Sequence, residues 1–305
     1  MLLEDIRRRI LSDADHFIAT CETEFKNKID TLAHAIANDA DKRPLVLLSG
    51  PSGSGKTTTS QMIANHLEQM GLETHIISLD NYFRTFTLEE KQLFERHELD
   101  LESPDRVNNE LLSCQIDAIL KGETVEVPRY DFTTNISHPG GETLRLHKGE
   151  IIIFEGIHAL NPSVVKSADE NTARIYVSVR TRIEHGKLGE QFLLHPSKVR
   201  LARRLIRDKR ERARSYADVV SVYDSVERGE NLYIMPYKHR ADFDVDTFVP
   251  YELCAYKSLL PPSMPEEEEK HPWLSELFEV LAELPAISPE AVPHDALIRE
   301  FIGNN

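Results

Sequence analysis

One octapeptide constrains this chain more than any other segment. Residues 50–57 read Gly-Pro-Ser-Gly-Ser-Gly-Lys-Thr and match the phosphate-binding pattern G-x-x-x-x-G-K-[ST] without interruption. The glycines let the backbone curl until several N–H groups point into one concavity that suits phosphate oxygens. Lys56 is expected to reach the outer phosphates, and the Thr57 hydroxyl to ligate magnesium. The residues predicted to bind a nucleoside triphosphate are Gly50, Ser52, Gly53, Ser54, Gly55, Lys56, Thr57 and Thr58.

The segments on either side of this loop support that interpretation. Leu45 to Leu48 form a short apolar run, as in a buried parallel strand, and residues 58–70 have the pattern of a helix that ends at Gly71. A strand, a glycine-rich turn and a helix in this order are the context that the loop requires. A flexible Gly/Ser linker is therefore a poor explanation of the octapeptide.

Composition excludes several classes of protein. The chain has 305 residues, of which 40% are hydrophobic, enough for one large or two medium globular domains. Its three cysteines form no C-x-x-C pair, so we expect neither a disulfide framework nor a zinc site. The formal net charge of -15 argues against binding nucleic acid over a broad surface. With no signal-like start and no membrane-length apolar stretch, we expect a cytoplasmic protein.

Apolar strands alternate with amphipathic helices along the chain, which predicts an α/β fold with a mostly parallel sheet. We expect an N-terminal helical appendage at 1–43, a nucleotide-binding domain at 44–260, and a linker with a helical tail at 261–305. The linker is predicted from the prolines at 261–265 and the run of glutamates at 266–269. Ile298, Phe301 and Ile302 form an apolar stripe that could dock on the body of the protein.

Two carboxylates follow predicted core strands. Asp80 comes directly after the strand at 74–79, and Glu155 after the strand at 151–154. In parallel α/β sheets, ligands bind beyond the carboxyl ends of the strands. Phosphoryl transfer needs one group to accept the proton of the attacking hydroxyl and another to orient magnesium. We predict Asp80 as the base and Glu155, with Thr57, as a magnesium ligand.

A strongly basic helix is predicted at about 197–215, with an apolar stripe on its other side. Like charges at helical spacing repel each other, so something should offset them. Triphosphate oxygens would do so, and an arginine on a mobile helix stabilises charge in the transition state.

A GTP-hydrolysing switch is the competing class of phosphate-loop protein. Asn27 to Asp30 match the guanine-reading string N-K-x-D, but they precede the loop and lie in a predicted helix. We interpret this match as chance. The histidines, His158 among them, lack close pairing with carboxylates in the sequence and are expected to be structural or exposed.

Over residues 44–260 the chain resembles the uridine kinase and phosphoribulokinase family of small-molecule kinases. Five segments carry the resemblance beyond the loop, and they are Ser78–Phe83, Ser103–Asp105, Pro128–Phe132, Phe154–Ile157 and Arg200–Asp208 followed by Arg212–Arg214. The resemblance implies a three-layer P-loop fold with an acceptor-binding hairpin and a helical lid.

The resemblance also implies roles for individual residues. Catalysis would involve Asp80, Lys56, Arg207 and Arg212, and Arg203 and Arg214 would help to bind the nucleotide. The residues implied for the acceptor are Asp80, Tyr82, Asp105, Tyr130, Phe132, Asn135 and Arg200. Two of the family's base-reading positions differ, because Asn135 stands in place of a histidine and Val222 in place of a glutamine.

The sequence thus predicts a kinase that transfers the γ-phosphate of ATP, with Mg²⁺, to a small acceptor, foremost the 5′-hydroxyl of uridine or cytidine. Since buried base edges without polar partners cost about 1 to 3 kcal/mol each, the two departures could redirect selectivity to another sugar or polyol. GTP stays open as a donor and a homo-oligomer as the assembly. An ATP-binding regulatory protein without efficient transfer is the alternative of a different class.

Overall fold

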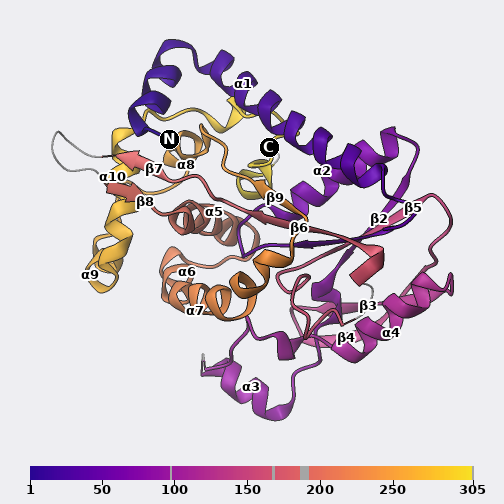
Figure 1. The fold of residues 1–305 in the computed structure, drawn as a ribbon. Coiled ribbons are helices and arrows are strands. Elements are labelled where there is room, and N and C mark those ends of the chain that lie inside the picture. Colours follow the sequence, from indigo (N-terminus) through magenta and orange to yellow (C-terminus); the bar gives the residue numbers. More distant parts are fainter. Residues whose placement is uncertain (97, 167–168, 186–191, 304–305) are drawn as a thin grey trace.

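Five parallel strands form the central sheet of the protein, in the order β2–β5–β1–β6–β9 (Figure 1). This computed structural model describes residues 1–96, 98–166, 169–185 and 192–303. The strands of the sheet are β1 Leu45–Ser49, β2 Glu73–Ser78, β5 Glu150–Glu155, β6 Thr172–Ser178 and β9 Phe243–Asp246. Two hairpins complete the strands, β3 Val125–Asp131 with β4 Ile136–Leu144, and β7 Ile183–His185 with β8 Phe192–Leu194.

Helices cover both faces of this sheet (Figure 1). Their bounds are α1 Leu3–Ala37, α2 Lys56–Gln69, α3 Leu88–Glu95, α4 Asn109–Leu120, α5 Pro196–Glu211, α6 Tyr216–Ser221, α7 Tyr223–Gly229, α8 Glu252–Lys257, α9 Pro265–Lys270, α10 Ser275–Glu283 and α11 Arg299–Ile302. Within the described ranges, every helix is too short or too polar to span a lipid bilayer.

The alternation of side chains along β1 explains why the fold has three layers. All five residues of β1 are buried. Val46 and Leu48 belong to one hydrophobic core, and Leu45 and Leu47 to a second core on the opposite face. A strand that is apolar on both faces has to be covered by helices on both sides. The predicted core strands and the parallel sheet are thereby confirmed.

The N-terminal helix and the C-terminal tail share the first of these cores. Residues of α1, α10 and the last segment, including Ile29, Leu277 and Phe301, pack in one cluster with Val46 of β1. The stripe predicted at Ile298, Phe301 and Ile302 is buried, and α11 packs against α5. The expected docking of the tail is confirmed.

The predicted linker is more ordered than the sequence indicated. The glutamates at 266–269 lie in α9, with Pro265 in its first turn. Proline is favoured at the first helical position, and acidic side chains in the first turn are favoured by the helix dipole. One of these acids, Glu267, is buried and pairs with Lys270 at 3.0 Å.

Strand register brings the predicted site together. In the parallel pairing, Leu48 of β1 lies opposite Glu155 of β5, and Ser78 of β2 also lies opposite Glu155. The loop after β1, Glu155 and the turn after β2 therefore emerge side by side at the carboxyl edge of the sheet.

Candidate active site

The phosphate loop has the close backbone approaches that require glycine. A Cβ at Gly50 would lie 1.9 Å from the carbonyl oxygen of Val177 on β6. Gly53 and Gly55 have φ angles of +74° and +83°, in the left-handed region that L side chains rarely adopt. The loop then leads into α2 at Lys56. The loop and the first turn of α2 thus have a backbone conformation in which N–H groups can bind an anion.

Thr57 and Glu155 lie within reach of each other, as a shared magnesium site requires. The Thr57 hydroxyl donates to Oε1 of Glu155 at 3.4 Å, and Lys56 Nζ lies 3.3 Å from the Pro51 carbonyl oxygen. The second oxygen of Glu155 is buried and has no hydrogen-bond partner among the described residues. Burial raises the pKa of Glu155 to about 7, Lys56 opposes this rise, and Asp80 adds to it. A buried carboxylate oxygen without a partner fits a hard cation beside the loop.

Asp80 lies at the same edge, on a short 3-10 turn that follows β2. Its backbone N–H donates to the Ser78 hydroxyl at 3.3 Å, which fixes the start of the turn. Burial raises the pKa of Asp80, and the charges of Lys56 and Arg212 oppose that rise. The carboxylate is therefore close enough to Lys56 for the charge of the lysine to affect its pKa.

Glu102 is a neighbour of this group that sequence reasoning missed. Burial raises the pKa of Glu102, the charges of Arg204 and Lys56 lower it, and Asp80 raises it. Asp105, the acid named from the sequence, is exposed on the next turn. The signal available was the position of Glu102 just before the Ser-Pro pair at 103–104.

The aromatic residues form a cluster whose membership differs from the prediction. Tyr82 is buried in the second core, and its hydroxyl donates to Gln115 at 2.7 Å. Phe83 instead meets the hairpin rings, with centroids 5.5 Å from Tyr130 and 6.2 Å from Phe132 in edge-to-face geometry. The turn after β2 directs Tyr82 inward and Phe83 toward the hairpin. Phe132 is 62% exposed, so the cluster has one face open to solvent.

Asn135 lies at the end of the same hairpin. It has a φ of +56°, and its side-chain oxygen accepts from the Tyr130 hydroxyl at 3.3 Å. Asparagine is one of the few residues that tolerate this backbone conformation. The position is therefore shaped by the turn as well as by any ligand.

Arg203 of α5 supports the phosphate loop from within the protein. Its guanidinium is 0% exposed and donates to both oxygens of Glu252 at 2.7 and 3.0 Å. It also donates to the Gly53 carbonyl at 3.1 Å and to the hydroxyl and carbonyl of Thr247. These five hydrogen bonds all go to acceptors within the protein. The structure therefore places Arg203 where it holds the phosphate loop, and its guanidinium does not face solvent.

Two further arginines of α5 contact the loop at Ser52. Arg200 donates to the Ser52 carbonyl at 3.3 Å and pairs with Glu230. Arg204 donates to the Ser52 hydroxyl at 2.7 Å, and burial lowers its pKa to about 10. Arg204 was not among the residues predicted for the site, although its guanidinium lies near Glu102.

Asp208, near the end of the basic helix, forms ion pairs with three arginines. Its carboxylate is fully buried and lies 2.7 Å from Arg207, 3.5 Å from Arg212 and 4.0 Å from Arg204. Although burial raises the pKa of Asp208, these guanidinium groups together hold it below its usual range. The backbone N–H of Arg214 donates to the Asp208 carbonyl at 3.2 Å. Acids of the chain itself thus offset part of the repulsion that the sequence indicated.

The family of the chain is shown by its similarity to known proteins. Residues 45–188 and 190–252 match the Phosphoribulokinase / Uridine kinase family. The chain belongs to this family. Uridine kinase of Staphylococcus haemolyticus (strain JCSC1435) is 31% identical over 202 residues, which cover 65% of this chain and 84% of the relative. Uridine kinase of Lactobacillus helveticus (strain DPC 4571) is 30% identical over 206 residues, 67% of this chain and 87% of the relative.

Among solved structures, that of a possible uridine kinase from Bacillus stearothermophilus is similar over 73% of this chain and 100% of its own, at 19% identity and a TM-score of 0.44. Membership of the phosphoribulokinase/uridine kinase family confirms the predicted three-layer P-loop fold. It also confirms the prediction of an ATP-dependent small-molecule kinase.

His158 is a further residue near the site whose position the sequence did not indicate. It lies three residues after Glu155 and is buried. Burial lowers the pKa of His158 to about 4, so the ring is neutral at neutral pH. The charge of Lys56 acts in the same direction. His158 is thus a buried, uncharged histidine, close enough to Lys56 for the charge of the lysine to affect its pKa.

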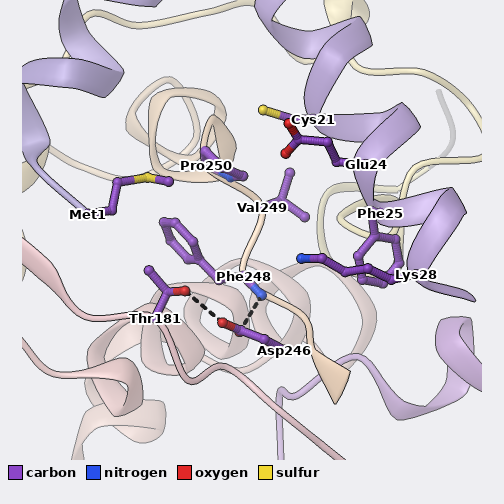
Figure 2. Close-up of a pocket in the computed structure, with 10 residues that line it drawn as sticks. All are labelled: Met1, Cys21, Glu24, Phe25, Lys28, Thr181, Asp246, Phe248, Val249 and Pro250. Atoms are coloured by element: carbon purple, nitrogen blue, oxygen red, sulfur yellow. Dashed lines mark hydrogen bonds between the residues drawn. The ribbon is translucent and has the colours of Figure 1, made fainter. Parts of the chain in front are cut away.

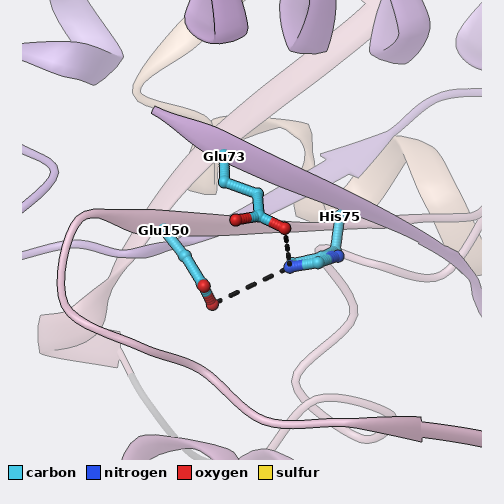
Figure 3. Close-up of side chains that lie close together, drawn as sticks. All are labelled: Glu73, His75 and Glu150. Carbon is cyan, nitrogen blue, oxygen red and sulfur yellow. Dashed lines mark ion pairs between the residues drawn. The ribbon is translucent and has the colours of Figure 1, made fainter. Parts of the chain in front are cut away.

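Two other groupings lie away from the phosphate loop. Figure 2 shows a pocket between α1 and the segment after β9, where Asp246 accepts from the Thr181 hydroxyl and the Phe248 N–H. In the described part of the chain, no predicted site residue lines this pocket. Figure 3 shows His75 between Glu73 and Glu150, 3.9 and 3.8 Å away, at the starts of β2 and β5. That is the end of the sheet opposite to the loop.

Proposed function

We propose that this protein transfers the γ-phosphate of ATP to a hydroxyl of a small acceptor, foremost the 5′-hydroxyl of uridine or cytidine. The observation that carries the proposal is that the turn bearing Asp80, after β2, and the phosphate loop, after β1, emerge at the same edge of the sheet, where the charge of Lys56 affects the pKa of Asp80. The names of the relatives, uridine kinases at 31% and 30% identity, support the choice of acceptor.

The loop is the part of the protein that would hold the donor. Its N–H groups and Lys56 would bind the β- and γ-phosphates, since these groups line the start of α2. Thr57 and Glu155 would hold Mg²⁺, and their hydrogen bond suits that role, as does the second oxygen of Glu155, which has no partner in the described part of the chain. Held there, the ion would supply positive charge that offsets the negative charge of the phosphates.

Asp80 would accept the proton of the attacking hydroxyl. Burial raises the pKa of Asp80, and the charges of Lys56 and Arg212 oppose that rise. A raised pKa makes the carboxylate a better proton acceptor. In-line attack needs the hydroxyl to lie between this carboxylate and the phosphate. The turn that carries Asp80 and the phosphate loop emerge at the same edge of the sheet, which allows this arrangement. The position of Asp80 and the charges around it support the proposal that it acts as the general base.

The acceptor would be held by an acid and an aromatic surface. Glu102 lies among the charges of Lys56, Arg204 and Asp80, so we propose it, in place of the exposed Asp105, as the acid that binds acceptor hydroxyls. Tyr130, Phe132 and Phe83 would pack against the body of the acceptor.

Arginines at the end of α5 would close over the transferring group. Arg212 is half exposed, and its charge affects the pKa of Asp80. Its ion pair with Asp208, at 3.5 Å, is longer than the 2.7 Å pair of Arg207 with the same carboxylate. Arg207 and Arg214 flank it in the sequence. Movement of this segment toward the phosphates would exclude water and stabilise negative charge in the transition state.

A kinase for another sugar or polyol is the second candidate, and one observation favours it. The Asn135 side-chain oxygen already accepts from the Tyr130 hydroxyl, and the Val222 side chain has no polar atom to pair with a pyrimidine edge. Acceptors recognised mainly through hydroxyl groups would not need these positions.

The test is an acceptor screen with γ-labelled ATP on the wild-type protein and the Asp80→Asn variant. We expect a phosphorylated nucleoside, sugar or polyol, and a fall in kcat of about 100- to 10,000-fold in the variant with ATP affinity retained. Unchanged turnover in the variant would refute Asp80 as the base. ATP binding without any phosphorylated product would support the regulatory alternative instead.

A further inference from the structure

The carboxylate of Glu300, on the C-terminal helix α11, binds to the first turn of the phosphate-loop helix. One oxygen, Oε2, accepts from the backbone N–H of Thr58 at 3.1 Å and from the Thr58 hydroxyl at 2.8 Å. The two residues are 242 positions apart in the sequence. The contact is therefore a long-range one that the fold has to build.

The position that this carboxylate takes is one at which a phosphate loop binds anions. The first N–H groups of a helix have no partner within the helix, and the dipole favours negative charge there. In phosphate loops these N–H groups cradle the phosphates nearest to the nucleoside. A carboxylate oxygen and a phosphate oxygen cannot both accept from the same N–H at hydrogen-bond distance, and their charges repel.

Buried neighbours hold the carboxylate in place. Leu297 is fully buried against the loop, with its methyl groups 3.2 Å from a Cβ built on Gly55. The Phe301 ring lies 4.9 Å from the guanidinium of Arg203. Arg299 donates to the carbonyls of Pro289, Val292, Pro293 and Gly303, which closes the last segment on itself. The segment is thus a packed part of the fold, and Glu300 is not a freely moving side chain on a loose tail.

We propose that residues 296–303 form an internal competitor of the phosphate donor, in which Glu300 occupies a phosphate position at Thr58 and has to leave when the donor binds. This rests on the proposed use of ATP. It adds that the structure described is a self-inhibited state, and that donor affinity is set partly by how firmly the tail is docked.

The first test is ATP binding by calorimetry, in the absence of acceptor, to the full-length chain. Glu300→Ala removes the competing carboxylate, and we expect it to tighten ATP binding on the order of tenfold, since charge-assisted hydrogen bonds are the strong ones. Glu300→Gln keeps a hydrogen-bond acceptor without the charge, so its ATP affinity should lie between those of Glu300→Ala and the wild type. Glu290→Gln changes the same charge at an exposed position of the tail and should leave affinity unchanged.

The second test uses only the wild-type chain. Hydrogen exchange should become faster at the amides of 299–303, which are bonded within the tail, and slower at those of 56–59 when ATP is added. This measurement also decides the question if Glu300→Ala does not fold.

Each outcome bears on a different proposal. Equal or weaker ATP binding by the Glu300 variants, or tail amides that stay equally protected at saturating ATP, would overturn the internal competitor and leave the kinase proposal standing. If no chain, variant or wild type, binds ATP at millimolar concentration, the proposed donor is refuted and the competitor with it.

Discussion

Replacing Glu252 by glutamine should destabilise the protein strongly, because it removes the counter-charge of the fully buried Arg203. The Arg203 guanidinium makes five hydrogen bonds, two of them to Glu252 and the others to Gly53 and Thr247. In Glu252→Gln the guanidinium stays charged, since the pKa of arginine is far above neutrality, and one glutamine N–H₂ group points its hydrogens at it. Breaking a buried ion pair by removing one partner costs about 3 to 5 kcal/mol.

Urea unfolding followed by circular dichroism measures this cost directly. The control is Asp244→Asn, which breaks the 3.0 Å pair between Arg180 and Asp244, whose side chains are 44% and 40% exposed. Exposed pairs contribute about 0 to 1 kcal/mol, so the control should unfold close to the wild type. The double variant Arg203→Met/Glu252→Gln removes both charges and should recover part of the loss.

A Glu252→Gln variant that unfolds within about 1 kcal/mol of the wild type would refute this reasoning, because a buried charge without a partner is not so easily accommodated. It would mean that Gly53 and Thr247 alone satisfy the guanidinium. A double variant less stable than Glu252→Gln would also count against it.

Two further predictions concern the acceptor and pH. Glu102→Gln should raise KM for the acceptor while Asp105→Asn leaves it unchanged, because Glu102 lies near the charges of Lys56 and Asp80 whereas Asp105 is exposed. Steady-state kinetics with the acceptor found in the screen measure both KM values. A higher KM in Asp105→Asn, with that of Glu102→Gln unchanged, would identify Asp105 as the acid that binds the acceptor. His158 has an ordinary pKa of 6.5 and a folded pKa of about 4, so the unfolded state binds more protons between these values and stability falls as the pH drops through that window. Between pH 7.5 and 5.0 the wild type should therefore lose about 2 kcal/mol more unfolding free energy than His158→Gln. The exposed His16→Gln serves as the control, and equal pH profiles for wild type and His158→Gln would show that His158 is not the titrating group.

The parts of the site that the sequence predicted are those fixed by local geometry or by general rules of the fold. The phosphate loop is defined by eight consecutive residues, and its glycine torsions follow from them. Asp80 and Glu155 could be paired because each follows a parallel strand, and such strands end at one edge of the sheet. Neither inference needed any contact between distant parts of the chain.

The parts that the sequence did not predict depend on where a turn points or on distant partners. A short turn decides that Phe83, and not Tyr82, joins the hairpin rings. Among the arginines of α5, only the fold shows that Arg203 meets Glu252 inside the protein. The contact of Glu300 with Thr58 likewise joins residues 242 positions apart. Helical periodicity carries no information on such partners.

The anchoring of α5 determines which part of the basic helix is free to move. The first turns of α5 are buried, and Arg200, Arg203 and Arg204 bond them to the phosphate loop. A rigid-body movement of the whole helix would therefore break the ion pair between Arg203 and Glu252. Residues 209–213 are exposed, and Ala213 takes a φ of +52° at their end. A closing movement over the phosphates would therefore involve only this short exposed segment, while the rest of the helix stays fixed. The hinge would lie at the last turn of the helix.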